Sequence, residues 1–430
     1  MREMKDSGLE WIGKIPKQWI LKKIKYLGTS RNGLTYKPTD IIDETEGTLV
    51  LRSSNIQNGK LVFDDNVFVS CKIPKELKVQ KDDILICSRN GSRELIGKNT
   101  LVNEIDATFG AFMLIYRCCA PHFLYYVLNS NVFKYYLGTF FTSTINQLTG
   151  TNFDNMKIAF CSNEEERKII VDYLDEKCTD IDNITADIQR QIEVLQEYKQ
   201  SVITEAVTKG LDKNVAMKDS GIEWIGNIPK NWSVKPIKYL YTVYSGATPK
   251  SNDIDNWDGD ITWITPADFK TEDKYIASGS RNITTKGYKS CNTNLVPENS
   301  IIFSKRAPIG TVALSKGVLC TNQGCLACVN NDSSNSLYYY YLMSVLTEQF
   351  ILYGSGTTFM EISTSNFENF KVVVPPKTEQ DKISNYLDKK CNYIDATISD
   401  KQKQLDTLTE YKKSLIYEYV TGKKEVPADA

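Results

Sequence analysis

The 430-residue chain has a single histidine, His122, and its eleven cysteines are irregularly spaced. One histidine leaves no histidine metal cluster, and a histidine-based catalytic triad would depend on that residue alone. Cysteines within apolar stretches such as "ILICS" and "CLACV" indicate reduced core residues rather than a secreted disulfide framework. We therefore expect a cytoplasmic protein in which His122 marks a helix start or the surface.

Long apolar runs and an excess of charge are also missing. No run approaches the roughly 20 residues of a membrane span, and the polar first residues lack a signal-peptide core. The 52 basic and 53 acidic residues nearly cancel. By segment, residues 1–155 carry 20 Lys and Arg against 16 Asp and Glu, whereas residues 156–210 carry 7 against 12. We expect no membrane partner, and a basic first region that leaves nucleic-acid binding open.

Familiar catalytic and ligand motifs are incomplete. "GSRELIGKN" has five residues between its glycines instead of the four of a phosphate loop, and Asn99 stands where Ser or Thr would hold magnesium. Cys325 and Cys328 form a C-x-x-C pair without the second pair that a structural zinc site needs. Asp82 and Asp83 are best explained as a turn before a strand. The sequence therefore predicts no catalytic residue, no metal and no cofactor.

What the chain does contain is a duplication. "MKDSGLEWIGKIPKQWILKKIKYL" begins at Met4 and "MKDSGIEWIGNIPKNWSVKPIKYL" at Met217, with 18 of 24 positions identical. "YLDEKCTDID" at Tyr173 returns at Tyr386, and "EYKQSVITEAVT" at Glu197 returns at Glu410, so the offset between the copies is constant. The middles between these matched ends diverge. A repeated frame with two different interiors indicates one mechanical role performed twice, while the interior does something different in each copy.

The matched tails have the periodicity of long amphipathic helices, which we expect over 164–209 and 378–421. Apolar residues recur about every seven positions, with Ile184 and Tyr198 among those beside the main stripe. Each helix is the obvious partner of the other, and the chain direction requires an antiparallel pair. The predicted coiled-coil seam contains Leu174, Ile181, Ile188, Leu195, Val202, Leu387, Ile394, Ile398, Leu405, Leu408 and Leu415.

The divergent middles are predicted to be α+β domains. Short apolar runs such as "TLVLRS", "DILICSR" and "SIIFSKR" are typical of strands, whereas "PHFLYYVLNSNVFKYYLG" and "SLYYYYLMSVLTEQFILYG" are typical of amphipathic helices. We place a first domain at 1–155, a first spacer helix at 156–210, a second domain at 211–376, and a second helix with the C-terminal tail at 377–430.

With these residues assembled, the chain resembles the specificity (S) subunit of type I restriction-modification enzymes. The words that carry the resemblance are the twin "DSGxEWIGxIPxxW" openings, "SGATPKSNDIDNWDGDITWITPADF" and "FMEISTSNFENFKVVVPPKTEQDKISNYLD". The resemblance implies two globular target-recognition domains in a pseudo-two-fold arrangement, joined by two long antiparallel coiled-coil helices.

The resemblance also implies a function and partners. The partners would be double-stranded DNA with a split asymmetric target, two methyltransferase (M) subunits, and restriction (R) subunits in the full complex. The Asn-Pro-Pro-aromatic and Asp-Pro-Pro-aromatic motifs of adenine-N6 methyltransferases are absent, so methyl transfer would belong to a partner. A two-headed scaffold that binds proteins is the alternative, favoured by the near-neutral net charge.

Base reading requires polar and cationic side chains at groove edges. In the first domain we expect it from Arg52, Ser53, Ser54, Asn55, Gln57, Ser88, Arg89, Asn90 and Arg93. In the second we expect it from Thr265, Asp268, Lys270, Ser304, Lys305 and Arg306, with two flexible loops contributing Lys286, Tyr288, Lys289, Ser355, Thr357 and Thr358.

Overall fold

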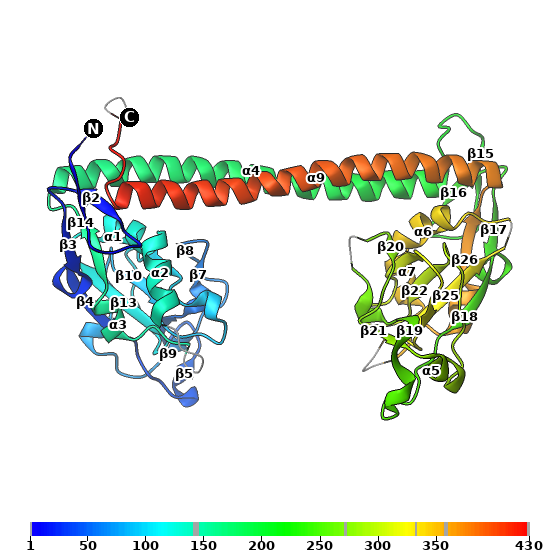
Figure 1. Ribbon diagram of the computed structural model, residues 1–430, viewed down its shortest axis with the longest axis horizontal. Coiled ribbons are helices and arrows are strands. Elements are labelled where there is room, and N and C mark those ends of the chain that lie inside the picture. Colours follow the sequence, from blue (N-terminus) through cyan, green and yellow to red (C-terminus); the bar gives the residue numbers. More distant parts are fainter. Residues whose placement is uncertain (1, 141–145, 271–272, 332, 357–359, 428–430) are drawn as a thin grey trace. The chain divides into compact units, whose positions relative to one another are not determined.

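The computed structural model describes residues 2–140, 146–270, 273–331, 333–356 and 360–427 (Figure 1). It divides into two compact units, and each is described by itself. The first unit contains residues 1–189 and 402–430, and the second contains residues 190–401. Each unit therefore combines one α+β domain with a part of both long helices.

The long helices are α4 (Glu164–Lys209) and α9 (Lys377–Val420). Three glutamates in the first turn of α4 favour its start, since carboxylates stabilise helix N-termini. Gly210 and Gly422, with φ of 79° and 69°, follow the two C-terminal ends. Both positions need the left-handed backbone that glycine adopts without steric cost.

The two helices run antiparallel within each unit. In the first unit the rings of Tyr173 and Tyr419 lie 4.7 Å apart, and Lys412 Nζ lies 2.5 Å from Asp182 Oδ1. In the second unit Lys199 Nζ lies 2.6 Å from Asp395 Oδ1, and Lys401 donates to Gln191. In both units a higher residue number on α4 therefore faces a lower one on α9.

The seam residues named from the heptad pattern are buried or half-buried in the structure. Leu174 and Leu415 belong to the core of the first unit, and Leu387 to the core of the second. Ile184 and Tyr198, which the pattern placed beside the stripe, are exposed. The apolar stripe is therefore narrower than the sequence pattern suggested.

The first domain is built on two four-stranded sheets. One has the order β11-β10-β13-β4 and the other β12-β6-β9-β5. The strands of the first sheet are β4 (Gly28–Asn32), β10 (Ile84–Cys87), β11 (Asn99–Leu101) and β13 (Met113–Cys118). Those of the second are β5 (Ile41–Ile42), β6 (Thr48–Leu51), β9 (Phe68–Val69) and β12 (Ala107–Phe109).

Two short antiparallel pairs frame this domain. β1 (Met4–Asp6) pairs with β2 (Lys14–Pro16), and β3 (Ile20–Lys23) pairs with β14 (Lys157–Phe160). The short hairpin β7 (Ile56–Gln57) and β8 (Lys60–Leu61) lies beyond β6, and α3 (Gly150–Asp154) precedes β14. These pairs involve the repeated opening phrase, so the frame is structurally part of the domain.

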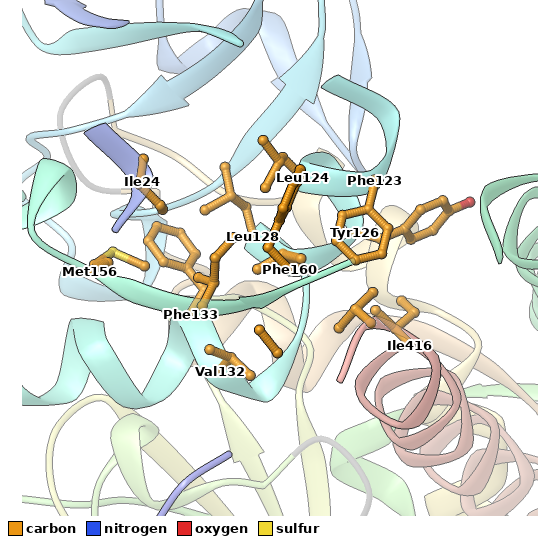
Figure 2. Packing of buried hydrophobic residues seen from close by; sticks show 14 of the residues in the cluster. Ile24, Phe123, Leu124, Tyr126, Leu128, Val132, Phe133, Met156, Phe160 and Ile416 are labelled. Atoms are coloured by element: carbon orange, nitrogen blue, oxygen red, sulfur yellow. The ribbon is translucent and has the colours of Figure 1, made fainter. Parts of the chain in front are cut away.

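The aromatic-rich segment predicted as one helix is two helices, α1 (Pro121–Leu128) and α2 (Asn131–Phe140). The break falls at Asn129, whose Nδ2 donates to Tyr125 O and to Asn99 Oδ1, both at 2.8 Å. Their apolar faces cover the core of the first unit, where Figure 2 shows Phe123, Leu128 and Phe133 among buried side chains that include Ile416 of α9.

The second domain repeats this plan. Its sheets have the orders β18-β25-β22-β23-β20 and β21-β19-β24. The first sheet contains β18 (Tyr241–Ser245), β20 (Tyr275–Ile276), β22 (Ile301–Ser304), β23 (Val312–Ser315) and β25 (Cys325–Asn330). The second contains β19 (Trp257–Ile264), β21 (Arg281–Ile283) and β24 (Cys320–Thr321).

Most of the remaining elements of the second domain have counterparts in the first, but the helix α5 does not. β15 (Met217–Asp219) pairs with β16 (Asn227–Pro229), and β17 (Ser233–Pro236) pairs with β26 (Lys371–Val374). The helices are α5 (Thr285–Ser290), α6 (Ser336–Ser344), α7 (Thr347–Leu352) and α8 (Thr364–Asn369). The segment predicted as one helix is again two, α6 and α7.

One glycine in each domain shows how far the duplication reaches. A Cβ on Gly33 would lie 2.2 Å from Gly110 O, and a Cβ on Gly246 would lie 2.1 Å from Thr321 O. The two glycines align when the opening phrases are superposed without a gap, and they follow β4 and β18. The divergent middles therefore share this feature of the backbone, in which the end of the strand packs directly against another main chain.

Within the part of the chain that the structure describes, no helix is long and apolar enough to cross a membrane.

Candidate nucleic-acid interface

The two loops predicted to read DNA in the first domain meet at the ends of β6 and β10. Asn90 Nδ2, after β10, donates a hydrogen bond of 3.2 Å to Ser53 Oγ, after β6. Cys87, at the end of β10, interacts with residues of both loops. Burial raises the pKa of its thiol, whereas the positive charge of Lys98 and hydrogen bonds with Asn90 and Ser53 oppose that rise. The fold thus gathers segments that are far apart in sequence.

Two of the predicted residues have structural roles instead. Asn55 is fully buried: its Oδ1 accepts from Arg52 N at 2.9 Å, and its Nδ2 donates to Val62 O at 3.1 Å. Ser88 is buried too, and its hydroxyl donates to Phe112 O at 2.9 Å. These side chains shape the loops and do not reach the surface, so we leave them out of the set proposed to contact bases.

The exposed members of the first set are Gln57, Arg89 and Arg93, while the half-buried members are Arg52, Ser53, Ser54 and Asn90. Arg52 is held by Asp65, with Nη2 2.9 Å from Oδ1. The Arg89 guanidinium lies 5.2 Å from the ring centroid of Phe112, which is 58% exposed. Sequence reasoning missed Phe112, and its only signal is a large apolar residue in a glycine-containing turn before β13.

The second domain repeats the turn that follows β6. Asp268 Oδ2 accepts from Thr265 N and Oγ1, both at 2.7 Å, and Oδ1 accepts from Ser280 N at 2.7 Å. Burial alone would raise the pKa of Asp268, but these hydrogen bonds lower it overall. Thr265 and Asp268 align with Arg52 and Asn55 at the constant offset of the repeat. As with Asn55, Asp268 closes the turn, and its neighbour Lys270 is exposed.

The loop after β22 is organised by Glu361. Ser304 is fully buried, and its Oγ donates to Arg306 O at 2.8 Å. Lys305 is 9% exposed, with Nζ 2.8 Å from Glu361 Oε1, and Arg306 Nη1 lies 3.4 Å from Glu361 Oε2. Ser355 pairs with Glu361 through two backbone hydrogen bonds of 3.0 and 3.1 Å. Glu361, which the sequence did not single out, therefore brings two predicted segments together.

The segment with Lys286, Tyr288 and Lys289 is not the flexible loop we expected, because it forms the short helix α5. A Cβ on Gly287 would lie 2.2 Å from Asn256 O, so α5 packs closely on the 3-10 turn Ile254–Asn256, which precedes β19. Tyr288 packs against the cluster around Trp257, Lys286 pairs with Asp255 at 2.8 Å, and Lys289 is exposed. Thr357 and Thr358 lie outside the described residues.

Arg89 and Arg306 occupy the same place in the two domains. Cys87 pairs with Met113 across the sheet, and Ser304 pairs with Cys325 in the equivalent ladder. The arginine lies two residues beyond Cys87 in one domain and two residues beyond Ser304 in the other. Each forms an isolated β-bridge with an equivalent residue, Gln147 for Arg89 and Glu361 for Arg306. The equivalent arginines therefore have different partners, a neutral glutamine in the first domain and an acidic glutamate in the second.

The enzyme-like features have ordinary structural explanations. His122 Nε2 lies 3.4 Å from Asp82 Oδ1 at the exposed start of α1. Cys325 and Cys328 lie on β25 but in separate core clusters, and burial raises the pKa of both thiols. Asp83 pairs with Arg117 through two contacts of 2.7 Å. Over the described ranges, no three His, Cys, Asp or Glu residues are grouped so as to hold a metal ion.

The chain is similar in sequence to known proteins. Residues 229–407 match the family model of the type I restriction modification DNA specificity domain. The type I restriction enzyme MjaIX specificity subunit of Methanocaldococcus jannaschii is 40% identical over 187 residues, which are 43% of this chain and 42% of that protein. The putative MjaX specificity subunit of the same organism is 27% identical over 435 residues, 96% of each chain. The resemblance to type I specificity subunits is confirmed.

The fold of this chain is similar to solved structures from type I R-M systems. A chain from a structural study of complex assembly and conformational transition of the type I R-M system aligns with a TM-score of 0.74 at 17% identity, over 95% of this chain and 99% of that one. The HsdS subunit of Thermoanaerobacter tengcongensis aligns with a TM-score of 0.52 at 16% identity, over 95% and 98%. The predicted fold class is confirmed: two α+β domains joined by two long helices that pair antiparallel.

Proposed function

We propose that this chain is the non-catalytic DNA-specificity subunit of a type I restriction-modification complex. Each domain reads one part of a bipartite target, and each copy of the repeated frame docks one methyltransferase subunit. Methyl transfer and cleavage belong to the methyltransferase and restriction subunits, so the chain itself contributes sequence recognition and geometry.

The observation that carries the proposal is the pair of equivalent arginines, Arg89 and Arg306, on one backbone plan used twice. Arginine can bind the O6 and N7 atoms of guanine through two hydrogen bonds, the commonest specific contact in the major groove. Different residues face the two arginines, Gln147 in one domain and Glu361 in the other. Two such readers with different surroundings fit a target whose halves have different sequences.

Other exposed or half-buried side chains of the predicted set supply the remaining contacts. In the first domain they are Arg52, Ser53, Gln57, Asn90 and Arg93, and in the second they are Thr265, Lys270, Lys289 and Ser355. Ser54 is left out, because its hydroxyl oxygen is buried. Phe112 adds an exposed ring beside Arg89 that can contact a thymine methyl group or a sugar.

The test is to assemble the chain with the methyltransferase subunit of the same system, treat a DNA library, and map the methylated adenines. The proposal predicts one split sequence with an unread gap of several base pairs. It also predicts that affinity falls steeply with salt, by roughly 10³–10⁵ between 50 and 200 mM if 6–10 phosphates are contacted. A protein-binding scaffold, the alternative, would give no sequence-dependent methylation and no such salt dependence.

A further inference from the structure

The repeated frame exposes the same tyrosine in both units. Tyr26 is 65% exposed and Tyr239 is 63% exposed, and they occupy equivalent positions in the two "IKYL" phrases. Each ends a 3-10 turn, Ile24–Tyr26 or Ile237–Tyr239, with Lys25 or Lys238 placed 5.4 or 5.6 Å from its ring centroid. A single exposed tyrosine would need no explanation. The same exposed ring beside the same cation in both units points to a contact made twice.

Both turns are anchored to the rest of the domain by a backbone hydrogen bond and a buried isoleucine. Ile24 N donates to Met156 O at 3.0 Å, and Ile237 N donates to Phe370 O at 3.0 Å. Ile24 and Ile237 are buried, and Figure 2 shows Ile24 among the core side chains with Met156. Because the backbone is already ordered, a partner that packs on the tyrosine ring pays little additional conformational entropy.

Further lysines lie on the paired strands next to each turn. In the first unit Lys23 and Lys157 lie directly opposite each other on β3 and β14, an arrangement of like charges that costs stability. In the second unit Lys371 of β26 lies opposite Pro236, two residues before Lys238. We call Lys23, Lys25, Tyr26 and Lys157 the first basic patch, and Lys238, Tyr239 and Lys371 the second basic patch.

The lysines of both patches lack acidic partners. Lys23 Nζ donates to Asn155 Oδ1 at 3.1 Å, and Lys238 Nζ donates to the equivalent Asn369 Oδ1 at 2.7 Å. Asp154, the carboxylate next to the first patch, accepts from Ser30 at 2.7 Å. Throughout the described segments, no lysine of either patch lies within ion-pairing distance of a carboxylate. Both patches thus complement an acidic surface.

The first patch lies at the opposite end of β4 from the reading loops. Its members Lys23, Lys25 and Tyr26 precede Gly28, where β4 begins. Gly33, beyond the other end of β4, packs against Gly110, two residues before Phe112. The length of this strand separates the two places by roughly 15 Å. In the second unit β18 separates Tyr239 from Gly246 in the same way. Each patch is therefore available to a partner other than the bases under the loops.

We propose that the two basic patches dock the two methyltransferase copies, each through a partner face that combines carboxylates with an apolar recess for the tyrosine ring. This inference rests on the proposed function and assigns that docking to particular residues. The occupant is a protein present in two copies, because the exposed tyrosine, its neighbouring lysine and the lysine on the paired strand recur in both units.

The experiment measures by native mass spectrometry how many methyltransferase copies the full-length chain binds, in the absence of DNA. Variants are Tyr26→Ala with Lys157→Glu, Tyr239→Ala with Lys371→Glu, and all four changes together. Lys72→Glu and Lys316→Glu make the same charge reversal at exposed lysines outside the patches and are the controls. Loss of an interface tyrosine commonly weakens binding about tenfold or more. We expect two copies for the wild type and controls, one for each paired variant, and none for the four-fold variant.

Two bound copies in every variant would overturn the inference. If copy number stays at two while the salt dependence of DNA binding weakens, the patches contact DNA phosphates and the inference is likewise wrong. If the wild-type chain binds no methyltransferase at all, the proposed function itself fails, which separates the two results. Far-ultraviolet circular dichroism of each variant ensures that a lost copy reflects docking and not unfolding.

Discussion

Lys305 and Glu361 form an ion pair behind the loop that follows β22, with Lys305 Nζ 2.8 Å from Glu361 Oε1 and the lysine side chain almost fully buried. Glu361→Gln would leave that ammonium group without its counter-charge. Because the glutamate is partly solvated, we expect a loss of about 1–3 kcal/mol in the free energy of unfolding, below the full cost of breaking a buried pair. Urea denaturation would measure it. The double variant Lys305→Met with Glu361→Gln should recover most of the loss, and equal losses in both variants would contradict a stabilising pair.

Arg89→Ala and Arg306→Ala should each affect one half of the target. A good two-bond contact to a base contributes about 1–3 kcal/mol of discrimination. We therefore expect each variant to tolerate substitutions at one base pair of its own half-site, while the other half-site is read as before. Methylation of a randomised target library gives both readouts at once. If a variant weakened all sequences uniformly, its arginine would contact phosphates and not a base.

Asp268 gives the second domain a pH-dependent contribution to stability. Its pKa is lowered in the folded protein by hydrogen bonds from Thr265 and Ser280 that outweigh its burial. A lowered pKa stabilises the fold above the ordinary value of about 3.9, and this stabilisation is lost as pH falls through the folded pKa. Asp268→Ala should cost about 1–2 kcal/mol at pH 7, as loss of a turn or helix cap does, and less at pH 3. An equal cost at both pH values in urea denaturation would exclude ionised Asp268 as the cause.

The antiparallel register can be tested with a cysteine that is already present. Cys178 is buried in the same core cluster as Leu415, and the contacts along the helices place position 415 opposite it. Under mild oxidation, Leu415→Cys should form a disulfide with Cys178 in high yield, seen by peptide mapping. Val202→Cys should do the same with Cys391 in the second unit. Leu387→Cys is the control, and a disulfide between positions 387 and 178 would indicate a parallel pair.

Local sequence patterns were enough to predict the long helices and several central strands of both domains. The heptad stripe that includes Leu174 and Leu387 is read from neighbouring residues, and the strands around Ile84 and Ile301 are short apolar runs bounded by polar residues. Both features depend on periodicity within one segment, so a single sequence contains the necessary information.

Long-range contacts explain what the sequence did not reveal. Lys305 was expected at the DNA surface, but it is neutralised by Glu361, which lies far along the chain, beyond α6 and α7. The helix break at Asn129 is fixed by its bond to Asn99, and α5 is held by the close approach of Gly287 to Asn256. The docking of Arg89 on Phe112 likewise joins a loop to a turn of another strand. None of these pairings has a local periodicity from which it could be predicted.

The central claim is that two independent readers share one frame, and a domain exchange tests it most directly. Residues 241–370 would be replaced by the corresponding segment of another type I specificity subunit, and methylation would be measured over a library with varied half-sites and spacers. The account predicts that one half-site changes to that of the donor, while the other half-site and the spacer length stay as they are. A change in both half-sites together, or in neither, would contradict it.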